Sequence, residues 1–128
     1  MKDFNLFKEY LTNDELVKIA PMVDRLSVLE DRKKREDNFL TFVKFVWPQF
    51  IEGNHHKIYA QKLQDVADGK INRLIINMPP RHTKSEFASY LFPSWLMGRD
   101  PTKKIIQATH TAELAVGFGR KVKNLIDD

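Results

Sequence analysis

The sequence predicts an α/β fold. Residues 1–38 form a helical N-terminal segment, and residues 39–128 form the strand–loop–helix–strand–helix start of a parallel sheet. Leu74–Ile76 is a short apolar run with β-branched residues, typical of a buried parallel strand. Lys104–Thr109 is a second such run, and each run is followed by residues with helical spacing. A strand–helix–strand order means a right-handed crossover, but two strands leave the sheet short of partners, so the predicted fold is incomplete as given.

The composition limits the size and class of the protein. A chain of 128 residues with 42% hydrophobic residues is at most one small domain with a real core. It has no cysteine, which excludes disulfides and thiolate metal sites and suits a reducing cytoplasm. A net charge of +4 permits a polyanionic partner such as DNA without requiring one. Neither a signal sequence nor a membrane span is apparent, so a soluble, intracellular protein is expected.

The N-terminal segment contains several helix signals. Asp3–Leu11 fits a short helix, and Thr12 with Glu15 forms a capping box that starts a second helix from Asp14 to about Ala20. Pro21 predicts a break or a fresh first turn. The mixed charges of Glu30–Asp37 fit either a DNA-contacting face or a solvated face, and alternating signs favour the solvated one.

Two further helices precede the first predicted strand. Asn38 is the expected cap of Phe39–Val46, which is apolar nearly all round and therefore buried on two sides or docked to a partner; core packing is the favoured interpretation. A helix then runs from His55 to Asp68, and Gly69 is its expected left-handed cap. Adjacent histidines on a helix point about 100° apart, which argues against a zinc site at His55-His56.

The loop after the first predicted strand has the layout of a phosphate-binding loop. Pro79-Pro80 ends the strand, and Lys84-Ser85-Glu86 opens a helix over Phe87–Met97, with Pro93 interrupting its pattern. Free N–H groups at a helix start face an anion, Lys84 would reach the β- and γ-phosphates, and the Ser85 hydroxyl would ligate Mg²⁺. The alternative is a basic turn that caps an ordinary helix.

The loop departs from the usual G-x-x-x-x-G-K-[ST] pattern, because Met78 and Thr83 occupy the glycine positions. Either Thr83 is strained at positive φ, or Pro79-Pro80 redirect the loop so that Thr83 keeps a negative φ. The second account is favoured here. It also gives Arg81 a role, since two prolines remove two backbone donors that a positive side chain would replace.

Residues Ile75–Glu86, with the core Pro-Pro-Arg-His-Thr-Lys-Ser-Glu, resemble the deviant Walker A segment of tailed-bacteriophage terminase large subunits. The resemblance covers about Phe39 to the C-terminus and includes Ala108–Ala115 and Phe118–Lys123. It implies the N-terminal part of a P-loop packaging ATPase, the motor that translocates viral DNA into the procapsid.

The resemblance also implies site residues, cofactors and partners. The cofactors are ATP and Mg²⁺; the partners are double-stranded viral DNA, the portal protein and the small terminase subunit, with a homo-oligomeric ring in the full-length protein and no membrane. The expected location is the host cytoplasm and, transiently, the procapsid portal. Lys84 and Arg81 are the catalytic candidates, and Ser85 is the Mg²⁺ ligand. The nucleotide-binding candidates are Pro80, Arg81, His82, Thr83, Lys84, Ser85 and Glu86, and the candidates for contacting the adenine are Gln49, His55 and Gln61.

Two parts of such a motor are missing from the sequence. No apolar strand ends in Asp-Glu; the nearest match, Leu125–Asp128, ends an amphipathic helix, and the family's nuclease domain is absent. The chain is therefore expected to be a fragment that is inactive alone. Two alternatives stay open: a non-enzymatic nucleotide-binding or partner-docking fragment, and another P-loop NTPase such as a helicase-like protein.

Overall fold

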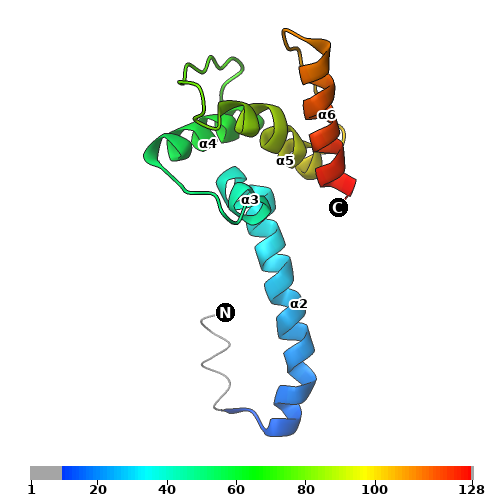
Figure 1. The fold of residues 1–128 in the computed structure, drawn as a ribbon. Helices are drawn as coiled ribbons and strands as arrows, with labels where there is room; N and C mark the ends of the chain where they lie inside the picture. Colours follow the sequence, from blue (N-terminus) through cyan, green and yellow to red (C-terminus); the bar gives the residue numbers. More distant parts are fainter. Residues whose placement is uncertain (1–9, 128) are drawn as a thin grey trace. The chain divides into compact units, whose positions relative to one another are not determined.

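The computed structural model describes residues 10–127, and within them every regular element is a helix. The elements are α2 (Asn13–Asp37), α3 (Phe39–Val46), α4 (Asn54–Ala67), the π-helix η2 (Glu86–Leu91), α5 (Phe92–Arg99) and α6 (Ala112–Asp127), drawn in Figure 1. The predicted helix Asp3–Leu11 lies almost wholly outside the described residues. The chain divides into two units, residues 1–34 and 35–128.

The predicted α/β fold is wrong, because neither expected strand forms in residues 10–127. Residues 73–79 and 103–109 are neither helical nor paired into a ladder. The side chains of Ile75 and Ile106 are 89% and 97% exposed, whereas a parallel strand buries such residues on both faces. An apolar run becomes a strand only when another strand satisfies its backbone groups. These runs have the composition of strands and no partner strand within the described chain.

In the first unit, α2 begins at the predicted capping box. The Thr12 N–H and hydroxyl both donate to Glu15 Oε2, at 2.9 and 2.8 Å. The predicted break at Pro21 is wrong, because α2 continues through it. A proline removes one intrahelical hydrogen bond, and the remaining hydrogen bonds of this 25-residue helix are sufficient to keep it continuous.

The second unit is held together by one apolar cluster. Asn38 caps α3 as predicted, with its Oδ1 accepting the Thr41 N–H at 2.9 Å. Buried side chains from α3, α4, η2 and α5 form the core, and they are Phe39, Val43, Tyr59, Ala60, Leu63, Phe87, Leu91 and Trp95. Trp95 also donates its indole N–H to the Arg35 carbonyl at 2.9 Å. The Phe39–Val43 face of α3 is thus covered by this chain itself, as the core interpretation predicted, whereas Phe45 on the other face is 61% exposed.

The helix after the loop is longer than predicted and does not stop at Pro93. It runs without a gap from Lys84 to Arg99 through η2 and α5. The Phe92 N–H donates to the Phe87 carbonyl, a wider turn than an α-helix makes. Pro93 has no N–H to give, and a widened turn before it moves the preceding carbonyls away from its ring. The helix therefore continues past Pro93 without a break.

The last helix, α6, forms where the helical spacing after residue 109 predicts it, although Leu114 and Ile126 of its apolar spacing are exposed. The Thr111 hydroxyl accepts the Leu114 N–H at 3.3 Å and caps the start of α6. Ala115, Phe118, Val122 and Leu125 are its partly buried residues, and Leu125 packs against the core. Among residues 10–127, no helix combines the length and apolar composition needed to cross a bilayer.

Candidate phosphate-binding site

The loop from Pro79 to Ser85 has an unusual backbone. Arg81 and Thr83 both adopt left-handed conformations, with φ of 64° and 58°. The helix begins directly afterwards at Lys84, and the Phe87 N–H donates to the Thr83 carbonyl at 2.9 Å. The expectation of a negative φ at Thr83 is therefore wrong. The two prolines fix only their own φ angles, and the chain still turns into the helix through left-handed residues.

This backbone brings N–H groups together. The N–H groups of Lys84, Ser85 and Glu86 precede the first intrahelical hydrogen bond and so have no partner within the helix. A left-handed residue followed by a right-handed one turns successive N–H groups toward one concavity, which binds anions. The positive end of the helix dipole adds to this. The loop thus has the backbone chemistry of an anion site.

Helix α4 holds the loop from behind with two hydrogen bonds. His56 Nε2 lies 2.9 Å from Thr83 Oγ1, and the Tyr59 hydroxyl donates to the Lys84 carbonyl at 2.9 Å. Tyr59 also stacks on Phe87, with ring centroids 5.3 Å apart. Burial raises the pKa of Tyr59 to about 12, so its hydroxyl stays a donor at every physiological pH. No signal in the sequence indicates this bond between Tyr59 and the loop.

His56 is the buried member of a group of histidines. It is 7% exposed, lies at the third position of α4, and its Nδ1 accepts the Gly53 N–H at 2.9 Å. Burial, reinforced by the neighbouring His55 and His82, holds the pKa of His56 below its ordinary value. Sequence reasoning considered His56 only as a metal ligand. The signal that it missed was the Gly53–His56 spacing, in which a side chain at the third helical position accepts the cap N–H.

The charged candidates lie on the open side of the loop. Arg81, His82 and Lys84 are exposed, and His82 Nδ1 lies 2.9 Å from the Pro80 carbonyl. The rings of His55 and His82 have centroids 5.7 Å apart, so α4 and the loop meet through them. Positive and polar side chains from both elements therefore surround the helix start.

Glu86 points to a different neighbour. Its Oε1 accepts from Lys121 Nζ of α6 at 2.9 Å, and Lys121 also lies 5.5 Å from the ring centroid of Tyr90. This pairing joins η2 to α6 and neutralises the carboxylate nearest the loop. Glu86 therefore links the two helices, and the exposed charges beside the loop are the cations Arg81 and Lys84.

The adenine candidates are not gathered in one place. A hollow of about 270 Å³ lies between α4 and the extended residues 74–78, and His55, Ile58 and Tyr59 line it. Gln49 is exposed in the turn after α3, and Gln61 donates to Asp65 Oδ1 at 3.1 Å on α4. Of the three candidates, the lining residues of this hollow include only His55. A base stacked beside the loop would therefore meet α4 through His55.

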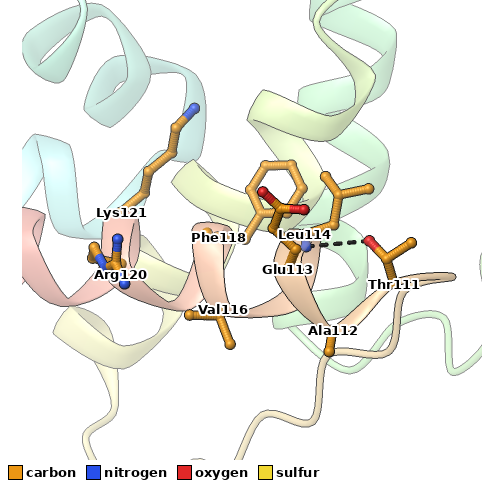
Figure 2. Close-up of a pocket in the computed structure, with 9 residues that line it drawn as sticks. Thr111, Ala112, Glu113, Leu114, Val116, Phe118, Arg120 and Lys121 are labelled. Atoms are coloured by element: carbon orange, nitrogen blue, oxygen red, sulfur yellow. Dashed lines mark hydrogen bonds between the residues drawn. The ribbon is translucent and has the colours of Figure 1, made fainter.

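A larger open hollow lies elsewhere, over the first turns of α6. Its volume is about 830 Å³, and Figure 2 shows Leu114, Phe118, Arg120 and Lys121 among the residues that line it. These residues come from α6 and the turn just before it. The loop residues 79–85 do not contribute to it, so it is separate from the candidate site.

The residues at the loop fit Mg²⁺ only as a companion of bound phosphates. The Ser85 side chain is exposed and offers one hydroxyl oxygen, and Glu86 is already paired with Lys121. Within residues 10–127, no three His, Cys, Asp or Glu side chains are grouped to hold a metal ion. Mg²⁺ commonly takes one or two protein ligands and completes its shell with phosphate oxygens and water, an arrangement that Ser85 can serve.

Comparisons of the chain with protein-family models, with curated proteins and with solved structures found no match.

Proposed function

We propose that the Pro79–Ser85 loop binds the phosphates of ATP, and that the chain is the N-terminal portion of a terminase large subunit, an ATP-hydrolysing DNA-packaging motor. One observation carries the phosphate site: Lys84 and Ser85 are the first two helical residues after left-handed Thr83. The assignment to a terminase rests on the resemblance of residues 75–86. The phosphate site needs the loop and the helix start and does not depend on a sheet.

Each loop residue has a distinct task in this proposal. The backbone N–H groups of residues 84–86 hold phosphate oxygens, and Lys84 supplies a mobile charge on its flexible stem. Arg81 adds a second charge that the left-handed backbone places on the exposed side of the loop. Ser85 is the Mg²⁺ ligand, and the bound ion would offset charge on the phosphates. Together these groups stabilise the charge that develops when water attacks the γ-phosphate.

The partners and location follow from the terminase resemblance alone. They are double-stranded viral DNA, the portal protein and the small terminase subunit, in a ring of copies at the procapsid portal in the host cytoplasm. A different P-loop NTPase, such as a helicase-like protein, would share the phosphate site and differ in substrate.

A partner-docking fragment is the second candidate function. Phe45, on α3, favours it, because its side chain is 61% exposed beneath the Arg35 guanidinium, 3.9 Å from the ring centroid. The opposite face of α3 is not available, since Phe39 and Val43 are buried in the core of this chain.

Titration of a fluorescent ATP analogue into the purified chain tests the phosphate site. We expect Lys84→Ala to weaken binding at least tenfold, because the mobile cation is lost. Lys103→Ala is the matched control: it removes the same charge from the turn after α5, where Lys103 lies 3.8 Å from Asp100. Equal affinities of wild type, Lys84→Ala and Lys103→Ala would refute the assignment.

A further inference from the structure

His56 is tied into a directed chain of hydrogen bonds that ends in the loop. The Gly53 N–H donates to His56 Nδ1 at 2.9 Å, so Nδ1 carries a lone pair and the proton of the neutral ring sits on Nε2. Nε2–H then donates to Thr83 Oγ1 at 2.9 Å, and the Thr83 hydroxyl donates to the His82 carbonyl at 2.6 Å. Each of the three donors in this series of hydrogen bonds meets one acceptor.

Thr83 needs such support. A β-branched residue at a φ of 58° is a true outlier, and it persists only where its surroundings impose it. Its side chain has two anchors, His56 on one side and its own loop on the other. The His56 ring is itself fixed by packing against Phe50 and Phe87, with centroids 4.8 and 5.6 Å away. His56 therefore connects the aromatic residues of the core to Thr83 in the loop.

We propose that His56 is a positioning residue for the phosphate loop: its neutral Nε2–H tautomer holds Thr83 left-handed, and the loop is competent for phosphate only while this bond is made. The phosphate part of the inference rests on the function proposed above. The control of Thr83 by His56 does not.

Protonation of His56 disrupts this series of hydrogen bonds. An imidazolium ring donates from both nitrogens, so a proton on Nδ1 would face the Gly53 N–H, donor against donor. The ring must then leave Gly53 or turn away from Thr83. The groups nearby are His55 and His82, which disfavour the charged ring, and Glu52, which favours it. Glu52 is occupied by Lys44 and Lys57, and burial is the strongest influence against charge, so acid acts on this bond below pH 6.5.

Two substitutions separate the two bonds of the ring. In His56→Gln the side-chain amide takes the place of Nε2–H and can still donate to Thr83. In His56→Asn the shorter side chain can accept the Gly53 N–H but cannot reach Thr83. The first variant keeps the proposed positioning bond, and the second keeps only the helix-capping bond.

The backbone readout uses the 128-residue chain without nucleotide. The three-bond HN–Hα coupling and the carbon shifts of Thr83, measured by NMR, report its φ. We expect positive-φ values in wild type and His56→Gln, and their loss in His56→Asn and in wild type as His56 titrates below pH 6.5. If a variant fails to fold, the wild-type titration decides alone. Unchanged Thr83 values in folded His56→Asn and across the titration would overturn the inference.

The binding readout uses the fluorescent ATP analogue. We expect His56→Asn to bind about 3- to 10-fold more weakly at neutral pH, the effect of one lost hydrogen bond, and His56→Gln to stay within about 2-fold of wild type. Protonation of the analogue's own phosphates affects its binding to every variant equally. If wild type loses more affinity in acid than His56→Gln does, the difference is therefore due to protonation of His56. If wild type binds no nucleotide while Thr83 still follows His56, the proposed function fails and the positioning role stands. Identical affinities and pH profiles for all three proteins would overturn the link between positioning and binding.

Discussion

Two glycine substitutions in the loop measure how the left-handed residues are held. Arg81 and Thr83 have nearly the same φ, 64° and 58°, but only Thr83 anchors its side chain: within residues 10–127, Arg81 makes no side-chain hydrogen bond or ion pair. A left-handed conformation costs an L-residue about 1–2 kcal/mol, which glycine recovers. Glycine also loosens the unfolded chain by about 0.4–1 kcal/mol. Arg81→Gly should therefore leave stability unchanged or raise it by up to about 1.5 kcal/mol.

Thr83→Gly removes the same backbone strain as Arg81→Gly, but it also removes the threonine hydroxyl. Two hydrogen bonds disappear, each contributing about 0.5–1.5 kcal/mol, and the Nε2–H of buried His56 is left without its acceptor. We expect Thr83→Gly to be less stable than Arg81→Gly by about 1–3 kcal/mol. Urea unfolding of both variants, followed by circular dichroism, gives this difference directly. A Thr83→Gly variant as stable as Arg81→Gly would show that the bond to His56 contributes nothing and that backbone strain alone governs the loop.

Other expected outcomes are independent of that comparison. Ser85→Ala should reduce the Mg²⁺-dependent part of nucleotide binding more than the Mg²⁺-free part; equal losses in titrations with and without EDTA would contradict the ligand role. Phe87→Ala removes a fully buried ring that contacts Phe39 and Tyr59, and should destabilise the chain by about 3–5 kcal/mol in thermal unfolding; a change below 1 kcal/mol would contradict the packing. The pKa of His56 is lowered in the folded chain, so the unfolded chain binds more protons in acid: unfolding free energy should be highest above pH 6.5 and fall as pH drops toward the lowered pKa, with His56→Gln showing a smaller loss in urea unfolding. The purified chain should release no phosphate from ATP above background, because its sequence holds no apolar run ending in Asp-Glu to position Mg²⁺ and the attacking water; turnover that Lys84→Ala abolishes would refute this.

Several helix ends were predictable because their signals are local. The Asn38 cap, the Gly69 left-handed cap with its φ of 72°, and the apolar spacing of α4 and α6 lie within a few residues of what they determine. The helix start at Lys84 was readable for the same reason, within three residues of its observed position. These features need no knowledge of the rest of the chain.

The strands and the support of the loop were not predictable in this way. Leu74–Ile76 has the composition of a strand, but a strand exists only through a partner that its own sequence does not specify. The bond between His56 and Thr83 joins residues 27 positions apart, and neither residue type announces it. The left-handed φ of Thr83 contradicts its own intrinsic preference, so a prediction based on that preference was bound to favour the wrong sign.

The π-helix η2 sets the direction in which the loop faces. Trp95 and Leu91 are locked into the core, and the chain between them and Lys84 passes through the widened turn. Each residue of an α-helix turns the chain by about 100°, so deleting one residue from 88–90 would allow a regular α-helix and rotate everything before it by about that angle relative to Trp95. Thr83 and Lys84 would then leave the side on which His56 and Tyr59 meet them. The surplus residue in η2 thus sets the rotation between the core at one end of the helix and the free N–H groups of residues 84–86 at the other.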